Sequence, residues 1–137
     1  MIIAIDFDGT CVVDNFPKIG RSIGAEGVLR RLIVEGHKLI LWTLRGTHYA
    51  AETCYLLHAI EWFRLNDIPL MGINENPELV GWEEWSRGPK VHADLFIDDR
   101  SLGVPLYDNG VDKPFVDWVD VEQLLIDKGI LHELPSL

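Results

Sequence analysis

The sequence predicts an α/β fold, a doubly wound, Rossmann-like parallel sheet with helices on both faces and no substantial cap domain. Short apolar runs end in polar residues, they alternate with stretches whose apolar residues recur at helical spacing, and no internal repeat interrupts them. With 137 residues, 47% of them hydrophobic, the chain matches one domain with its own core, so we predict a single domain over 1–137.

The first half of the chain begins with a strand over 1–7, a run of Ile and Ala closed by an acid, as in a fully buried parallel strand. From Ala25 the apolar positions follow helical spacing, and Gly36 is well placed to end that helix in a left-handed turn. The segment 38–43 again predicts a strand.

In the second helix, expected over 49–65 and capped by Thr47, apolar residues lie on most faces, which indicates close packing into the domain. A third strand is predicted over 68–73 and a fourth over 93–97. Strands and helices that alternate in this way form parallel sheets through right-handed crossovers.

The last elements are a possible fifth strand over 115–119 and a C-terminal helix. Asp120 and Gln123 have the spacing of a capping box, and Gly129 is placed to end the helix. The expected order of strands and helices is then complete.

Polar side chains follow the predicted strands at the points where those strands end. Because the carboxyl ends of parallel strands meet at one edge of the sheet, we expect these side chains to share a crevice. Lys90 lies just before the fourth strand, and its long side chain would enter from the loop side. The other members of this set are Asp6, Asp8, Thr43, Arg45, Asp98 and Asp99.

These residues resemble the motifs of the haloacid dehalogenase-like hydrolase superfamily, over a span from Met1 to about Arg100. The first motif, D-x-D-G-T, is specific when it follows an apolar strand. The segment K-x-x-A-D-x-F-I-D-D-R is similar to small phosphatases of the capsule-biosynthesis type. The four motifs correspond to Asp6-Phe7-Asp8-Gly9-Thr10, Leu41-Trp42-Thr43, Lys90 and Asp98-Asp99.

The resemblance implies a magnesium-dependent phosphatase that hydrolyses a phosphomonoester through an aspartyl-phosphate. Asp6 would be the nucleophile, and Asp8 would protonate the leaving oxygen and then take a proton from water. Thr43 and Lys90 would complete the catalytic set by holding the phosphoryl oxygens. The dehalogenases of the superfamily lack an acid at the position of Asp8, which favours phosphoryl chemistry.

A cation is needed here because two carboxylates would repel a dianionic phosphate. Mg²⁺ prefers such oxygen ligands. The resemblance implies that it binds Asp6, the backbone carbonyl of Asp8, Asp98 and, directly or through water, Asp99. The remaining candidates for substrate binding are the backbone N–H groups of the first loop, from Phe7, Gly9 and Thr10, and two arginines, Arg45 and Arg100.

Some features depart from the superfamily pattern. Lys90 stands closer to the acidic pair than is usual, and Lys38 is a poorly placed rival. The gaps between the motifs are too short for a cap, although the segment with Trp82 and Trp85 has the composition of an irregular connection or lid. Two alternatives remain: a catalytically silent domain that binds phosphate or magnesium, and a phosphotransferase acting on a sugar hydroxyl.

Charge and composition restrict the partners. A net charge of -10 opposes nucleic-acid binding, which depends on Lys and Arg displacing counterions. The lack of a long apolar run or of a signal sequence at the start predicts no membrane partner and a cytoplasmic location. We therefore expect a phosphorylated small molecule, such as a sugar phosphate or a nucleotide. An open site also makes a homo-oligomer plausible, because a neighbouring subunit can serve as lid.

Overall fold

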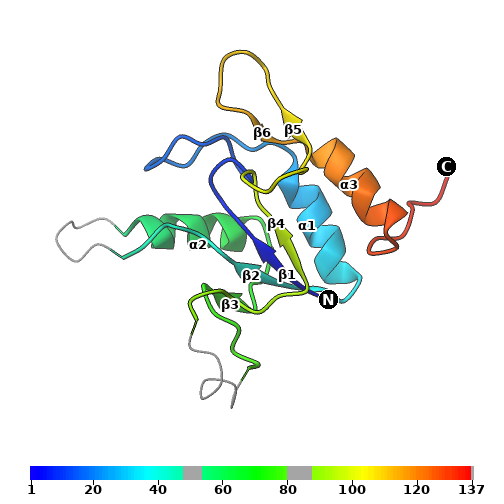
Figure 1. Ribbon diagram of the computed structural model, residues 1–137, viewed down its shortest axis with the longest axis horizontal. Coiled ribbons are helices and arrows are strands. Elements are labelled where there is room, and N and C mark those ends of the chain that lie inside the picture. The colour runs from blue at the N-terminus through cyan, green and yellow to red at the C-terminus, as the bar shows by residue number, and fades with distance from the viewer. Residues whose placement is uncertain (48–53, 80–87, 137) are drawn as a thin grey trace.

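The computed structural model describes residues 1–47, 54–79 and 88–136. Its centre is a four-stranded parallel sheet in the order β3-β2-β1-β4 (Figure 1). The α/β class and the parallel sheet predicted from the sequence are confirmed. The strands are β1 (Ile2–Ile5), β2 (Lys38–Leu41), β3 (Gly72–Ile73) and β4 (Leu95–Ile97).

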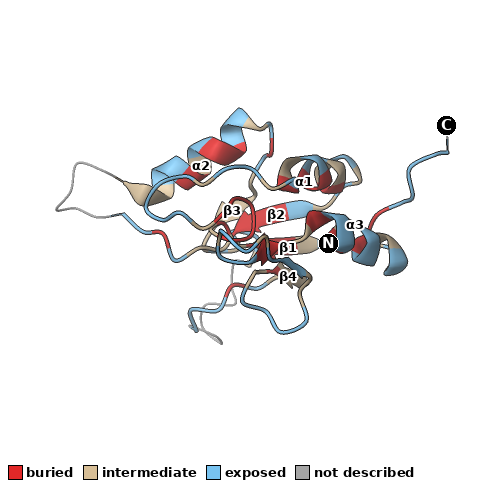
Figure 2. Ribbon diagram, turned by 90° about the horizontal axis from the view of Figure 1, so that it is seen from above, coloured by how far each residue is buried: buried red, intermediate tan, exposed pale blue. Residues whose placement is uncertain are grey.

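One face of the sheet carries the main core. Ile3 and Ile5 of β1 point to this face, because successive side chains of a strand alternate between faces. All three helices contribute buried residues to the same core, and Figure 2 shows α1 and α2 side by side along the sheet. The helices are α1 (Ala25–Val34), α2 (Tyr55–Leu65) and α3 (Trp118–Asp127).

The second face carries a smaller cluster of Ala4, Ile40 and Val91, with partly buried neighbours such as Trp42 and Phe96. Val91 comes from the coil that precedes β4. Within the described residues, no helix contributes to this cluster. The doubly wound arrangement, with helices on both faces, therefore stays a prediction.

The observed strands are shorter than the predicted ones, and two boundaries of the central elements need correction. Helix α2 begins at Tyr55 with Cys54 at its N-cap, so Thr47 does not cap it; residues 48–53 lie outside the described chain. The third strand is only two residues long. A Cβ added at Gly72 would lie 2.4 Å from the Glu75 carbonyl oxygen, so the chain turns back at once after this strand.

The C-terminal part differs from the predicted parallel strand. β5 (Leu106–Tyr107) and β6 (Phe115–Val116) form a separate antiparallel pair. Asp117, and not Asp120, caps α3, because its side chain accepts hydrogen bonds from the backbone N–H of Val119 and of Asp120. Gly129 lies just beyond this helix with a φ of 71°, as expected for a helix-ending glycine.

A short flap, residues 11–24, connects the first motif to α1. Val13 N–H donates to the Arg21 carbonyl at 3.0 Å and closes the flap on itself. No inserted cap domain is present in the described ranges, while Trp82 and Trp85, the predicted lid residues, lie outside them. Among these same residues, no helix is both long enough and apolar enough to cross a membrane.

Candidate active site

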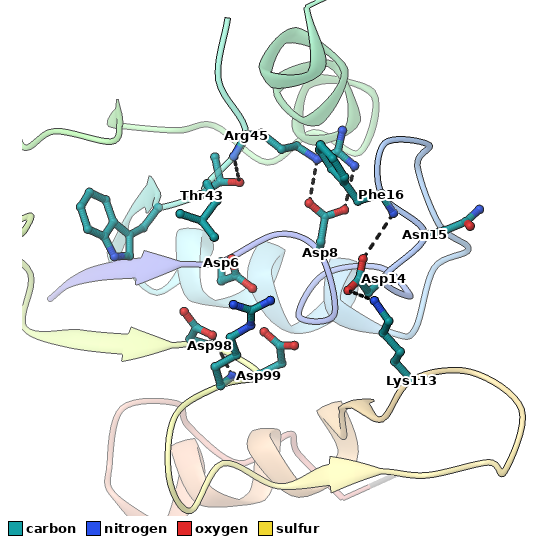
Figure 3. A pocket seen from close by; sticks show the side chains of 13 residues that line it. Asp6, Asp8, Asp14, Asn15, Phe16, Thr43, Arg45, Asp98, Asp99 and Lys113 are labelled. Atoms are coloured by element: carbon teal, nitrogen blue, oxygen red, sulfur yellow. Dashed lines mark hydrogen bonds and ion pairs between the residues drawn. The ribbon is translucent and has the colours of Figure 1, made fainter. Parts of the chain in front are cut away.

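A cavity of about 790 Å³ opens at the carboxyl edge of the sheet, where the sequence predicted a crevice (Figure 3). Seven of the predicted site residues line it, and further residues come from the flap and from the β5–β6 hairpin. The lining residues are Asp6, Asp8, Asp14, Asn15, Phe16, Trp42, Thr43, Leu44, Arg45, Asp98, Asp99, Arg100 and Lys113.

Three aspartates form the base of this cavity. Asp6 follows β1, whereas Asp98 and Asp99 follow β4, and the pairing of β1 with β4 brings these strand ends together although they are far apart in sequence. The Asp6 N–H donates to the Ile97 carbonyl at 3.0 Å. One carboxylate oxygen from each aspartate lies within 4.8 Å of the others, which is close enough to hold a metal ion.

The electrostatics of this cluster are unfavourable without a cation. The pKa of Asp6 is raised from 3.8 to about 8, mainly by burial and also by the nearby Asp98 and Asp99, while the hydrogen bond from Thr10 opposes the rise. Burial also raises the pKa of Asp99. A hard cation with oxygen ligands would offset both burial and the repulsion between the carboxylates, since it replaces the lost hydration and neutralises like charge.

Thr10 and Gly9 shape the loop around the cluster. The fully buried Thr10 hydroxyl accepts from the Asp99 N–H at 2.9 Å and lies 2.8 Å from Asp6 Oδ2, to which it donates. Gly9 has a φ of 81°, and a Cβ there would lie 2.4 Å from Asp99 Oδ2. Only glycine lets the loop approach this carboxylate so closely.

The predicted substrate contacts of the first loop need revision. The Gly9 N–H donates to the Val12 carbonyl at 2.8 Å, and the Thr10 N–H donates to the Phe7 carbonyl at 3.1 Å. The Phe7 side chain is fully buried and packs edge-on against Trp62. Gly9 and Thr10 thus use their N–H groups to close the loop rather than to offer them to a ligand.

Two residues that the sequence did not single out support this loop. The indole Nε1–H of Trp118, at the start of α3, donates to the Thr10 carbonyl at 2.6 Å. The Val116 N–H of β6 donates to the Gly9 carbonyl at 3.0 Å. A buried indole usually needs an acceptor, which is a weak sequence signal for Trp118; no local signal marks Val116.

Asp8 lies on the wall of the cavity and pairs with Arg45. Both Asp8 oxygens lie 2.7 Å from guanidinium nitrogens, in a two-pronged ion pair that Figure 3 shows. Arg45 is only 3% exposed and donates to backbone carbonyls with its remaining N–H groups. Contrary to the expectation of a substrate contact, Arg45 has all its donors engaged within the protein.

Thr43 lines the cavity as predicted. Its N–H donates to Asn74 Oδ1 at 2.8 Å, and its hydroxyl oxygen accepts from the Arg45 N–H at 3.1 Å. Because a hydroxyl that accepts can still donate, the Thr43 hydrogen can point into the cavity. Asn74 was missed in the sequence because an asparagine after a strand is an ordinary turn residue.

The cations of the cavity are not those that the motifs suggested. Lys90 lies outside the lining set, with its Nζ 5.6 Å from the centre of the Phe96 ring. Its rival Lys38 pairs with Glu78 and starts β2 at the opposite edge of the sheet. Arg100 lines the cavity, as predicted, and so does Lys113 from the β5–β6 hairpin.

Lys113 pairs with Asp14 of the flap, with Nζ and Oδ2 3.1 Å apart (Figure 3). Burial raises the pKa of Asp14, but the hydrogen bonds from Lys113 and from the Phe16 N–H, together with the charges of Lys113 and Arg100, bring this pKa below its usual value. With Asp8 and Asp14 paired, Arg100 is the remaining lining cation against three carboxylates. The base of the cavity therefore holds more carboxyl groups than cations.

Comparison with known proteins gives one informative relative. No protein-family model and no curated protein match the chain. A solved structure of a conserved protein encoded by a locus of Bacteroides thetaiotaomicron is 36% identical, with a TM-score of 0.70, over 93% of this chain and 91% of that one. Its description names no activity. At this identity and coverage, the chain belongs to the same family as that conserved Bacteroides thetaiotaomicron protein.

Proposed function

We propose that this protein is a magnesium-dependent phosphatase of the haloacid dehalogenase-like superfamily, which hydrolyses a phosphomonoester through an aspartyl-phosphate. One observation carries the proposal. Asp6, Asp98 and Asp99 converge at the base of a cavity whose wall holds Asp8 and Thr43. Each of the superfamily motifs except the lysine is therefore represented in one cavity.

The residues fit a hard divalent cation. Carboxylate oxygens are the ligands that Mg²⁺ prefers, and Asp6, Asp98 and Asp99 supply them within 4.8 Å of one another. When bound, the cation would neutralise charge on Asp6 and on the phosphoryl oxygens. The raised pKa of Asp6 supports this fit, because the carboxylate needs a counter-charge to be ionised at neutral pH.

In the first step, a carboxylate oxygen of Asp6 attacks phosphorus as the ester P–O bond breaks. Asp8 gives a proton to the departing oxygen, so that an alcohol leaves and an aspartyl-phosphate remains. The Thr43 hydroxyl donates to a phosphoryl oxygen. Arg100 and Lys113 supply the positive charge that the sequence assigned to Lys90.

In the second step, water attacks phosphorus in line, and Asp8 now takes its proton. The bond between phosphorus and the Asp6 oxygen breaks, which releases inorganic phosphate and restores the Asp6 carboxylate. Asp8 ends the cycle with the proton that it needs for the next ester. The two aspartates therefore need different surroundings, one suited to attack and one to proton transfer.

The size of the cavity supports a substrate larger than phosphate itself. A volume of about 790 Å³ falls in the range of small-molecule sites and suits a sugar phosphate or a nucleotide.

We further propose a cytoplasmic enzyme, in which a second subunit can serve as lid. We also propose a doubly wound sheet with helices on both faces.

The decisive experiment measures hydrolysis of 4-nitrophenyl phosphate by the wild type and by Asp6→Asn, with magnesium and with a chelator. We expect turnover only for the wild type with magnesium, and a loss of at least about 10³-fold in kcat for Asp6→Asn. The matched control is Asp67→Asn, which makes the same change outside the cavity. Activity that survives chelation or Asp6→Asn would disprove the mechanism.

A binding domain without turnover is the competing function. The placement of Lys90 beside Phe96, away from the cavity lining, favours it. That function predicts binding of magnesium and inorganic phosphate by calorimetry, with no hydrolysis of a panel of sugar phosphates, nucleotides and aryl phosphates. A substrate found in the panel would exclude it and would also identify the leaving group.

A further inference from the structure

Arg45 connects three separate segments of the chain. Its Nε–H and one Nη2–H donate to Asp8, while the Nη1 hydrogens donate to the Pro17 and Tyr55 carbonyls at 3.1 Å each. The second Nη2–H donates to the Lys18 carbonyl at 3.0 Å. All five guanidinium donors are thereby satisfied, which is the full capacity of an arginine.

The position of Arg45 is also fixed by packing. Its guanidinium carbon lies 5.2 Å from the centre of the Phe7 ring and 5.1 Å from that of Phe16, so one aromatic ring comes from the first motif and the other from the flap. The Arg45 side chain is almost fully buried, and the Asp8 side chain is 18% exposed. A shift of the flap would therefore move the group that holds Asp8.

We propose that Arg45 is the positioning residue of Asp8 and that it couples the orientation of this carboxylate to the flap. The inference rests on the proposed function. Asp8 must turn one oxygen toward the leaving group, and the two-pronged contact lets the other oxygen stay on Arg45. Phe16 lines the cavity and packs against the Arg45 guanidinium. A leaving group that shifts Phe16 would therefore also shift the guanidinium that holds Asp8.

A purely structural Arg45 makes a different prediction from a positioning one. If it only held the flap, its loss would weaken every step of the reaction to a similar extent. If it acts through Asp8, its loss affects the steps that need a proton transfer. Release of 4-nitrophenolate needs little help from an acid, whereas attack by water on the aspartyl-phosphate needs Asp8 as a base.

The test compares Arg45→Met and Arg45→Lys with wild type in stopped-flow hydrolysis of 4-nitrophenyl phosphate with saturating magnesium. For Arg45→Met, we expect the rate of the first-turnover burst to stay within about threefold of the wild-type rate, while the steady-state rate falls about 10²-fold. Arg45→Lys keeps the charge but cannot form the two-pronged contact with Asp8, so its steady-state rate should lie between those of the wild type and Arg45→Met. Arg64→Met serves as control, since Arg64 is an exposed α2 residue paired with Glu61.

Three results would overturn the inference: an equal loss of both phases, an unchanged steady state, or a further loss when Arg45→Met is added to Asp8→Asn. If Arg45→Met fails to fold, Arg45→Lys decides. A second measurement works without turnover. The Arg45 Nε–H should exchange slowly with solvent in the wild type and at least about tenfold faster in Asp8→Ala, because that variant removes its acceptor.

Exchange that is fast in the wild type, or equal in the two proteins, would also overturn the inference. A wild type that hydrolyses no phosphate ester would disprove the proposed function alone, and the exchange of Arg45 Nε–H would still decide whether Arg45 holds Asp8.

Discussion

Asp6 and Asp8 are separated by one residue, yet they lie in opposite electrostatic surroundings. Asp6 shares the base of the cavity with Asp98 and Asp99, and its pKa is raised to about 8, first by burial and then by these carboxylates. Asp8 lies on the wall, where Arg45 contacts both of its oxygens. The base lacks positive charge, whereas the wall supplies its own.

The contrast shows how one short motif can hold two carboxylates for different tasks. The base is suited to a ligand that brings charge, because its stability is lowered until that charge arrives. The wall is ordered in advance, because its ion pair is complete within the protein. Substitutions at the two places should therefore change stability in opposite directions.

The largest effect is expected for Asp8→Ala. This change leaves the buried Arg45 without its carboxylate partner, and loss of one member of a buried pair typically costs about 3 to 5 kcal/mol. Urea unfolding measures the change. Asp14→Ala is the matched control, because it breaks the pair with the exposed Lys113 and should cost less than about 1 kcal/mol. Equal losses in the two variants would contradict the contrast.

The base should show the opposite sign in protein stripped of divalent cations. The Asp6 pKa is about 8 in the folded protein and 3.8 as an ordinary carboxyl, so the folded state holds a proton that the unfolded state loses. This contribution to stability is complete below the ordinary pKa and disappears as the pH rises through about 8.

The free energy of unfolding should therefore fall between pH 4 and pH 8, and Asp6→Asn should flatten this dependence. We expect the variant to be more stable than the wild type at the upper end by about 2 kcal/mol, less than the full shift implies, because three carboxylates share the protons. Added magnesium should restore the wild type. Stability that rises with pH in the chelated wild type would refute this account.

Gly9→Ala tests how closely the base is packed. The substitution places a methyl group against Asp99 in a backbone conformation that disfavours side chains, while Gly103→Ala has a similar φ of 89° with nothing within 4 Å. Both changes carry a conformational cost of about 1 kcal/mol, and the displaced carboxylate should add about 1 kcal/mol more at Gly9. Calorimetry should show weaker magnesium binding in Gly9→Ala alone; equal affinities would show that Asp99 can move without loss.

The sequence predicted the base of the site well, because its residues are set by local features. Asp6 and Asp98 follow apolar strands, and parallel pairing then brings them to one edge of the sheet. The antiparallel pair β5–β6 was not predicted, since a two-residue strand has too few residues for its periodicity to show direction.

The wall of the cavity, with Asp8 and Arg45, and its rim, where Lys113 lies, were harder to predict. An arginine after a strand is usually a solvated surface residue, and only the fold shows that Arg45 is buried between Phe7 and Phe16. Lys113 reaches the cavity from a hairpin that follows every motif in the sequence. Its role depends on tertiary contacts, which no spacing along the chain encodes.

Lys113→Ala should have the smallest effect and tests whether the rim serves the substrate or the fold. Its pair with Asp14 is exposed, with the lysine side chain at 74%, so stability should change by less than about 0.5 kcal/mol. A charge about 4 Å from a phosphate in water contributes about 1 kcal/mol, which corresponds to about a fivefold rise in KM with kcat little changed.

Lys38→Ala is the control, because it removes an exposed lysine whose Glu78 pair lies at the opposite edge of the sheet, and it should leave KM unaltered. The rise in KM for Lys113→Ala should shrink at high salt, since exposed charges are screened. A KM that is equal in the two variants would assign Lys113 to holding the flap through Asp14. It would leave Arg100 as the substrate-facing cation of the cavity.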